Sequence, residues 1–343
     1  MIREAIGTLI DKRRDLTEDE AAAVMQEIMR AEVTPAQFGA FVIALREKGE
    51  SIDEIVGMAK VMREHALYVP ITERPLLDTC GTGGAMLKTF NVSTAAAFIA
   101  AAAGARVAKH GNRAMTSQSG SADLLEALGA QISLTPEQVV ECVRRTGVGF
   151  MFAQAFHPAM KFAAPLRREI GVRTVFNILG PLTNPAGANC HVLGVPSEAL
   201  AEKLAHALAR LGMRHALVVT GAEGLDEISI SGPTTLFEVR GDVVARSEIA
   251  PEQVGLARHP VDVMRGGTAA ENAVALRAVL SGEGSAGLRD FIMLNAAAGL
   301  YVAGLASSIR QGVEQARAAI ESGDAAARLG AFVEATRRVA SAT

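Results

Sequence analysis

The stretch DTCGTGGAMLKTFNVSTAAA, residues 78–97, decides how the rest of the chain is organised. Leu76–Cys80 is a short apolar run typical of a buried strand, and it breaks into Gly81–Gly84, where missing Cβ atoms let backbone amides turn inward. Ser93 or Thr94 is then expected to cap an Ala-rich helix whose first N–H groups and dipole also favour negative charge. The stretch therefore predicts two anion-binding features that face one place.

A second strand and loop follow directly. Arg106–Lys109 is predicted as a strand, and it leads into KHGNR, residues 109–113, and a run of small polar residues before a helix that begins near Ala122. The loop adds three potential cations, Lys109, His110 and Arg113.

A glycine turn after a strand is weak evidence by itself, because most such turns only connect a strand to a helix. No Lys-Ser/Thr follows at Walker spacing, and the third glycine of a dinucleotide fingerprint is missing. The combination at two successive strand ends is more specific, since open α/β sheets bind ligands there. We interpret it as a site for a phosphorylated ligand.

The chain before the glycine turn is predicted to be helical. Capping boxes begin at Thr17, Thr34 and Ser51, and a further helix is expected at Ile2–Ile10. Residues 70–75 carry two prolines around polar residues and are predicted to be a linker. No catalytic residues cluster in the helical part, which favours a structural or dimer-forming role.

After the linker, strand and helix patterns alternate, which predicts a mainly parallel sheet flanked by helices, an α/β fold. Gly241–Asp242 is typical of a hairpin turn, and helices are expected again from Thr268. The predicted strands are Leu76–Cys80, Arg106–Lys109, Gln131–Ser133, Val148–Ala153, His191–Val195, Ala216–Thr220, Ile228–Ser231, Thr235–Val239 and Val243–Ile249.

Composition limits the function classes. The net charge of -3 and pI of about 6.2 provide no global basic field, so nucleic acid is not an expected partner. Cys80, Cys142 and Cys190 are widely spaced without a CxxC pair, which argues against disulfides or a thiolate zinc site. No signal peptide or membrane span is predicted, and we expect a cytoplasmic location.

Several motifs make a family resemblance specific. GTGG (81–84), TFNVSTAAA (89–97) and KHGNRA (109–114) with SGSADLLEALG (119–129) resemble the anthranilate phosphoribosyltransferases. Later segments match the same family in the same order, namely FHPAMK (156–161), RTVFNILGPLTNP (173–185) and GLDE (224–227). The resemblance covers nearly the whole chain.

The resemblance implies a fold of the nucleoside phosphorylase/phosphoribosyltransferase type. Residues 1–72 would form a small helical domain that makes a homodimer contact, and residues 73–343 would bind phosphoribosyl pyrophosphate. A segment near 165–185 would pack with the helical domain.

The resemblance also implies the site. Residues expected to bind phosphoribosyl pyrophosphate are Gly81, Thr82, Gly83, Gly84, Thr89, Asn91, Val92, Ser93, Thr94, Lys109, Gly111, Asn112, Arg113, Ser117 and Ser121. Residues expected to bind anthranilate are Gly81, His110, Asn112, His157 and Arg167.

Magnesium is the expected cofactor, because a polyphosphate substrate and adjacent carboxylates together offer the oxygen ligands that it takes. Asp226 and Glu227 follow the predicted strand Ala216–Thr220, and the resemblance implies that they bind Mg²⁺, with help from the Ser93 hydroxyl. Adjacent carboxylates on a solvated loop are otherwise ordinary surface charge.

The implied reaction is attack of the anthranilate amine on C1 of the ribose, with inversion and loss of pyrophosphate. An aryl amine is largely neutral at pH 7 and needs positioning more than deprotonation, so no general base is assigned. Two positions depart from the family: Ala85 stands where Asp is usual and Gln118 where Lys is common. We interpret both as changes in metal or substrate handling.

Two alternatives remain open at this point. One is a nucleoside phosphorylase of related fold, against which stand the HGNRA segment and the arginine after HPAMK, suited to a carboxylate-bearing acceptor. The other is a non-catalytic, nucleic-acid-binding relative, against which stand the acidic pI and the Asp226–Glu227 pair.

Overall fold

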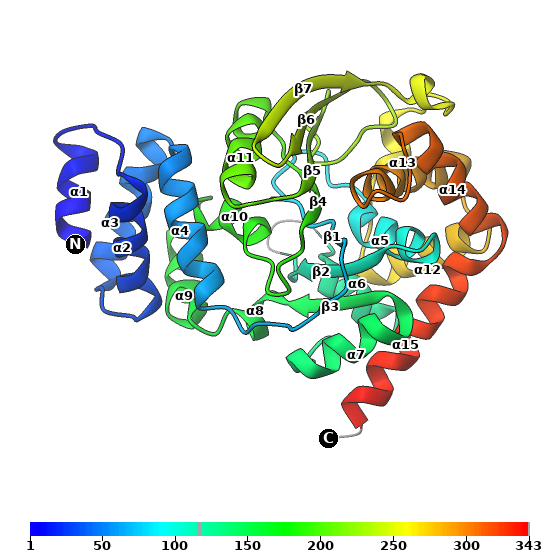
Figure 1. Ribbon diagram of the computed structural model, residues 1–343, viewed down its shortest axis with the longest axis horizontal. Coiled ribbons are helices and arrows are strands. Elements are labelled where there is room, and N and C mark those ends of the chain that lie inside the picture. The colour runs from blue at the N-terminus through cyan, green and yellow to red at the C-terminus, as the bar shows by residue number, and fades with distance from the viewer. Residues whose placement is uncertain (115–117, 342–343) are drawn as a thin grey trace.

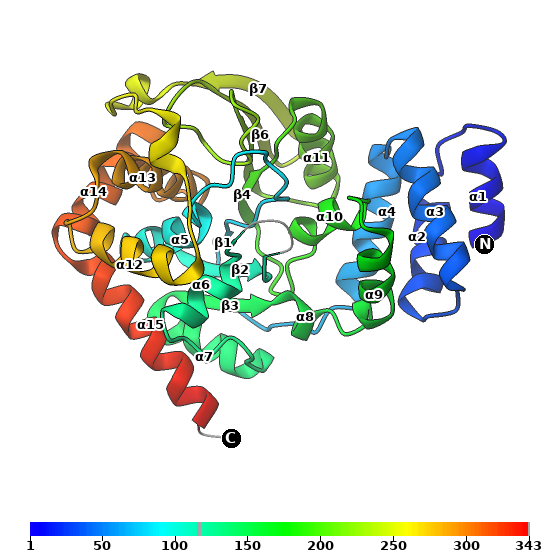
Figure 2. The ribbon, with the colours of Figure 1, turned by 180° about the vertical axis from the view of Figure 1, so that it is seen from behind.

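The structure of the chain is a computed structural model, and it describes residues 1–114 and 118–341. A bundle of helices lies beside a larger body built around one sheet (Figures 1 and 2). No helix within the described ranges is long and apolar enough to cross a membrane.

The N-terminal bundle forms where the capping signals predict it. Its helices are α1 (Ile2–Ile10), α2 (Glu18–Met29), α3 (Pro35–Lys48) and α4 (Ile52–Glu64). The three predicted capping boxes are present: at the first, the Glu20 N–H donates to Thr17 Oγ1 at 3.2 Å and the Thr17 N–H donates to Glu20 Oε2 at 2.8 Å.

A seven-stranded sheet forms the centre of the larger body, in the order β3-β2-β1-β4-β5-β6-β7. The first five strands in the chain pair in parallel, and the last two are antiparallel, which confirms the mainly parallel sheet. The strands are β1 (Leu76–Asp78), β2 (Arg106–Gly111), β3 (Val148–Phe152), β4 (Cys190–Gly194), β5 (His215–Gly221), β6 (Thr234–Arg240) and β7 (Val243–Ile249). The predicted hairpin turn joins β6 to β7, with Gly241 at φ +57°.

Two predicted strands were wrong, because other groups take up their backbone bonds. At Gln131–Ser133 the Gln131 N–H donates to the Thr336 hydroxyl at 3.1 Å, so this segment packs on a helix. At Ile228–Ser231 the amide of Asn295 bonds both the N–H and the carbonyl of Ile228 at 3.0 Å. A side chain here replaces the neighbouring strand that a ladder would need.

Helices cover both faces of the sheet (Figure 1). The remaining α-helices are α5 (Val92–Ala102), α6 (Ser121–Ala127), α7 (Pro136–Thr146), α8 (Ala153–Phe156), α9 (Met160–Ile170), α10 (Phe176–Leu179), α11 (Glu198–Arg210), α12 (Ala269–Leu280), α13 (Ala286–Val302), α14 (Ile309–Glu321) and α15 (Asp324–Ser341). Short 3-10 turns lie at Gly180–Leu182, Pro251–Val254 and Val261–Met264.

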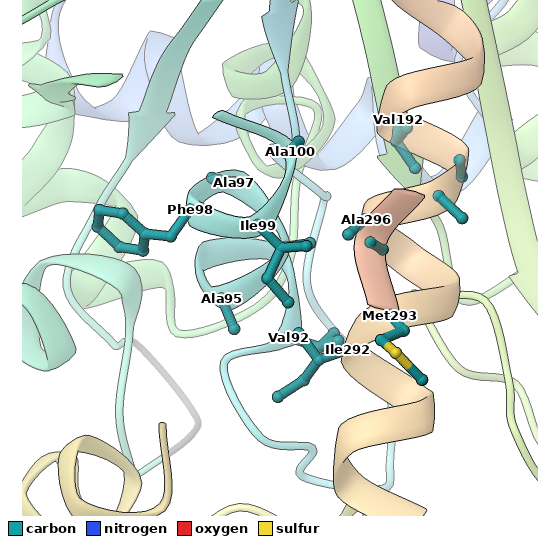
Figure 3. Close-up of a cluster of buried hydrophobic side chains, with 14 of the residues drawn as sticks. Val92, Ala95, Ala97, Phe98, Ile99, Ala100, Val192, Ile292, Met293 and Ala296 are labelled. Atoms are coloured by element: carbon teal, nitrogen blue, oxygen red, sulfur yellow. The ribbon is translucent and has the colours of Figure 1, made fainter. Parts of the chain in front are cut away.

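The Ala-rich helix α5 lies in the centre of one hydrophobic core. Val92 and Ile99 on α5 face Ile292 and Ala296 on α13 (Figure 3), and all four are fully buried. The small alanine side chains of α5 allow close packing, so the first turn of this helix is fixed rigidly behind the glycine turn.

A second core joins the bundle to the sheet through α9, α10 and α11. The Phe38 ring on α3 stacks on Phe176 at 5.6 Å between centroids and meets Phe162 edge-on at 6.3 Å. Arg46 on α3 donates to the Arg173 carbonyl at 2.8 Å. Residues 160–182 thus contact the bundle, while the domain boundary at 72/73 stays a prediction.

Candidate active site

The carboxyl ends of β1, β2, β4 and β5 meet at one edge of the sheet, as parallel neighbours must. The glycine turn leaves β1, the Lys109–Arg113 segment ends β2, and the Asp226–Glu227 pair follows β5. Ligands of open α/β sheets bind at this edge. Features that are far apart in the sequence therefore lie around one place.

The glycine turn is shaped by close backbone contact with β4. The Thr82 N–H donates to the Gly194 carbonyl at 2.9 Å, and a Cβ added to Gly81 would lie 3.1 Å from the same oxygen. Gly83 and Gly84 have φ of +65° and +102°, which L side chains rarely adopt. The turn requires glycine at both positions.

Gly194 also positions the carboxylate pair. A Cβ on Gly194 would lie only 1.7 Å from the backbone oxygen of Asp226, so the segment after β5 packs directly on this glycine. The Gly221 N–H donates to the Leu225 carbonyl at 3.0 Å, which closes the turn that returns the chain to β4. Asp226 is thereby brought beside Gly83, where its Oδ2 would lie 4.0 Å from an added Cβ.

The two carboxylates are half-buried, and each has a raised pKa. Burial raises the pKa of Glu227 well above its usual range, and the adjacent Asp226 raises it further. Burial also raises the pKa of Asp226, against the opposing charges of Arg173 and Lys88. In the described part of the chain neither carboxylate forms an ion pair. A cation bound between the two carboxylates would offset their burial and mutual repulsion.

The donors fit a hard divalent cation that is shared with a ligand. Among residues 1–114 and 118–341, no group of three or more His, Cys, Asp or Glu could hold a metal. Two carboxylates alone leave most of an octahedral shell open, as is usual for magnesium held together with substrate phosphates.

Lys109 is buried and supplies a fixed positive charge beneath the turn. Its Nζ donates to the Thr79 carbonyl at 3.1 Å, the Thr79 hydroxyl at 3.0 Å and the Ser93 hydroxyl at 3.2 Å. All three ammonium hydrogens therefore have protein acceptors, and the charge of Lys109 lowers the pKa of Glu227. Ser93, the third predicted metal ligand, thus lies against Lys109.

The predicted cap of α5 was wrong. The helix begins at Val92 with Asn91 as N-cap, and Ser93 and Thr94 lie inside its first turn. The Asn91 amide instead accepts from Ser119 Oγ at 3.0 Å and from Asn272 Nδ2 at 2.8 Å, so it fixes the loop before α6. The Thr94 hydroxyl is buried and has no partner in the described chain.

The loop after β2 is less clearly directed at a ligand. Arg113 pairs with Asp123 and Glu126, and its guanidinium lies 5.5 Å from the Phe152 ring centre. Gly111 packs on Phe150, and Asn112 Oδ1 accepts from the Arg113 N–H at 2.8 Å. Other predicted residues lie nearby: Ser121 begins α6, the half-buried Thr89 bridges to Arg265, and Ser117 falls outside the described residues.

The two predicted histidines meet. Their ring centroids are 5.0 Å apart, and burial lowers the pKa of His110 to about 3 and that of His157 to about 4. His110 Nδ1 lies 3.2 Å from the Gly180 carbonyl, which makes that nitrogen the donor. Within the described residues the Nε2 of each ring is buried without a partner. The pair offers neutral imidazoles to a ligand.

Arg167 and Arg168 differ in their exposure. Arg168 is exposed on α9, whereas Arg167 is half-buried with its Cζ 5.5 Å from the Phe176 ring centre. Burial lowers the pKa of Arg167, its Nε has no hydrogen-bond partner and it forms no ion pair in the part of the chain described. This cation is therefore open to an external carboxylate. Among the described residues, Arg167 Nε and the Nε2 atoms of the two histidines do not bond one another.

Sequence reasoning missed several residues that build this edge. Asp78 is buried and accepts from the Thr79 N–H at 2.7 Å, from the His110 N–H at 3.3 Å and from Asn184 Nδ2 at 2.6 Å. It therefore joins the ends of β1 and β2. Arg173 donates to two carbonyls of the glycine turn. Gly194, which has no side chain, lies between that turn and the backbone of Asp226. Arg173 and Asn184 lie in RTVFNILGPLTNP, but only the fold shows what they touch.

Comparison with known proteins agrees with this geometry. Residues 73–326 match the family described as "Glycosyl transferase family, a/b domain", and residues 3–66 match "Glycosyl transferase family, helical bundle domain". The chain is 57% identical over 337 residues to an anthranilate phosphoribosyltransferase of Chloroflexus aggregans, covering 98% of each chain. It is 52% identical to that of Herpetosiphon aurantiacus, covering 98% and 99%.

Solved structures give the same result. The anthranilate phosphoribosyltransferase of Thermus thermophilus is 46% identical with a TM-score of 0.92, over 98% of this chain and 99% of that one. The enzyme of Saccharomyces cerevisiae in complex with PRPP and Mg is 28% identical with a TM-score of 0.91, over 98% of each chain. Because the Chloroflexus aggregans enzyme is 57% identical along nearly the whole chain, the chain belongs to the anthranilate phosphoribosyltransferase family.

Proposed function

We propose that this chain transfers the phosphoribosyl group of phosphoribosyl pyrophosphate to the amine of anthranilate, giving N-(5-phosphoribosyl)anthranilate and pyrophosphate, a step of tryptophan biosynthesis. The observation that carries the proposal is the meeting of the glycine turn, Lys109 and the Asp226–Glu227 pair at one sheet edge. That edge can hold a polyphosphate and its metal together.

The cofactor in this proposal is Mg²⁺, held by Asp226 and Glu227 with the substrate's phosphate oxygens. Bound there, it would neutralise charge that builds on the departing pyrophosphate. The yeast relative was solved in complex with PRPP and Mg, which supports this choice.

The chain's own residues then act by position and charge. The N–H groups of the glycine turn and of the first turn of α5 would donate to phosphate oxygens of the bound substrate. Lys109 adds a buried positive charge. Preorganised donors of this kind stabilise charge without rearranging during the reaction. The amine attacks C1 of the ribose as pyrophosphate leaves, with inversion.

The acceptor side of the proposal rests on Arg167 and the histidine pair. A guanidinium without a protein carboxylate suits the carboxylate of anthranilate, and His110 and His157 are held neutral by burial. Two imidazoles with pKa values this low do not accept a proton readily near pH 7. The proposal therefore keeps no general base, and the acceptor is oriented as a neutral amine.

We further propose a homodimer that forms through the helical bundle, with residues 1–72 as the helical domain and 73–343 as the phosphoribosyl-pyrophosphate domain. Met1 and Ile10, at the two ends of the outermost helix α1, are exposed hydrophobic residues and support a contact there. Light scattering of the purified protein measures the subunit number.

A cytoplasmic location is supported by three cysteines that are all free.

The test follows the loss of anthranilate fluorescence with phosphoribosyl pyrophosphate and Mg²⁺. A parallel reaction offers a pyrimidine nucleoside with phosphate. The proposal expects turnover only in the first mixture. Turnover only in the second would replace it with a nucleoside phosphorylase, and a salt-dependent complex with DNA without either turnover would favour the binding-protein alternative.

A further inference from the structure

Arg173 lies where a positioning residue for the glycine turn would be needed. Its Nη2 donates to the Thr82 carbonyl at 3.2 Å and to the Gly83 carbonyl at 3.0 Å. Its guanidinium also packs closely on Gly84, because a Cβ there would be 2.1 Å from Nη1. One side chain thus contacts three consecutive residues of the turn.

These bonds fix the direction of the amides that follow. In a trans peptide the C=O and the next N–H point in opposite directions. When Arg173 holds the carbonyls of Thr82 and Gly83 on its own side, the N–H groups of Gly83 and Gly84 must point away from it. Without that constraint, two successive glycines at positive φ could turn these peptide planes at little cost.

Arg173 is itself held from the helical bundle. Its carbonyl accepts from Arg46 Nη1 on α3 at 2.8 Å, and the next residue, Thr174, bonds Asn177 at the start of α10. Burial lowers the pKa of the Arg173 guanidinium, and Asp226 opposes that shift by its charge. The residue therefore connects the helical bundle to the glycine turn.

We propose that Arg173 is a positioning residue that holds the amides of the glycine turn toward the pyrophosphate and ties that turn to the helical bundle through Arg46. The inference rests on the proposed function, because it takes phosphoribosyl pyrophosphate as the ligand of the turn. It assigns Arg173 no contact with the reacting atoms.

The first test measures binding of phosphoribosyl pyrophosphate with Mg²⁺ by calorimetry, without anthranilate. Arg173→Ala should weaken binding about tenfold or more, in line with the loss of a charge-assisted hydrogen bond. In turnover, the KM for phosphoribosyl pyrophosphate should rise likewise while the KM for anthranilate changes little. Arg173→Lys, which keeps a cationic donor, should recover part of the loss. The exposed Arg168→Ala on α9 is the matched control and should bind as the wild type does.

A double-mutant cycle separates positioning from a general structural effect. Gly84→Ala would place a Cβ 2.1 Å from Arg173 Nη1 and so displace the guanidinium. Adding Arg173→Ala to it should therefore cost little more than the worse single change. Arg46→Ala should reproduce part of the Arg173→Ala effect with the same preference for phosphoribosyl pyrophosphate.

Three results would overturn the inference: wild-type affinity in Arg173→Ala, equal effects on both substrates, or fully additive effects in the cycle. The proposed function fails differently. If the wild type binds phosphoribosyl pyrophosphate but does not consume anthranilate, only the acceptor assignment is lost. If the wild type binds no phosphoribosyl pyrophosphate, both are overturned.

Discussion

Gly194→Ala should separate the carboxylate pair from the glycine turn without replacing a residue of either. The new Cβ would lie 1.7 Å from the Asp226 backbone oxygen. Both partners are backbone atoms, so no side-chain rotation can relieve the overlap. Restoring a contact of about 3.0 Å requires a shift of about 1.3 Å, and a misplacement of about 1 Å can cost on the order of 10²-fold in rate.

The assay is kcat/KM for phosphoribosyl pyrophosphate from anthranilate fluorescence, with circular dichroism to confirm folding. Gly330→Ala is the control, because Gly330 lies on α15 with nothing within 4 Å of an added Cβ. The control should keep full activity and gain about 0.5–1 kcal/mol in stability. If Gly194→Ala does not fold, Asp226→Asn tests the same carboxylate without the overlap. A folded Gly194→Ala enzyme with wild-type kcat/KM would refute the reasoning.

Arg167→Ala should raise the anthranilate KM by the equivalent of about 1.5–3 kcal/mol and the KM for phosphoribosyl pyrophosphate by less. The control Arg168→Ala should leave both KM values unchanged. Equal increases in both KM values for Arg167→Ala would move Arg167 out of the acceptor site. Burial lowers the pKa of His157 to about 4, so between about pH 6.5 and 4 the unfolded chain binds a proton that the folded chain does not. The free energy of unfolding is therefore unaffected above this window and falls as the pH falls through it, by up to about 1.4 kcal/mol per pH unit. His157→Gln should flatten the decline in Tm from pH 7 to 5, and an unchanged slope would mean that this histidine does not contribute. Ala85 is buried with only 4% of its surface exposed, and Ala85→Asp would place a carboxylate beside the glycine turn, so inhibition by excess Mg²⁺ should strengthen while the anthranilate KM changes little. If the activities of the wild type and Ala85→Asp depend identically on magnesium concentration, Ala85 has no metal role. If Ala85→Asp does not fold, packing decides the residue at this position.

Local signals predicted most of the fold correctly. The capping boxes at Thr17, Thr34 and Ser51 formed as expected, because each depends on residues three apart in the sequence. The glycine turn and the hairpin at Gly241 formed for a similarly local reason, the positive φ that their residues adopt.

The errors came from competition that only tertiary structure decides. Ile228–Ser231 has strand-like residues, but the Asn295 amide takes its backbone bonds. Ser93 is a good capping residue, yet its hydroxyl lies against Lys109 and Asn91 begins the helix. Either arrangement satisfies the local rules, and the neighbours select one.

The candidate site divides in the same way. Glycines, carboxylates and the basic loop are visible as motifs, so the residues at the sheet edge could be named. Gly194 and Arg173 are 110 and 89 positions from Gly84, and their roles consist of a close backbone approach and two bonds to carbonyls. Nothing in residue type or spacing encodes such a contact.

The most direct test of the central claim is a calorimetric titration with phosphoribosyl pyrophosphate, with and without Mg²⁺, of the wild type and of the double variant Asp226→Asn, Glu227→Gln. The variant keeps the shape of both side chains and removes their charge. We predict that Mg²⁺ strengthens binding to the wild type and that this gain is lost in the variant. An equal gain from Mg²⁺ in both proteins would contradict the placement of substrate and metal at this edge of the sheet.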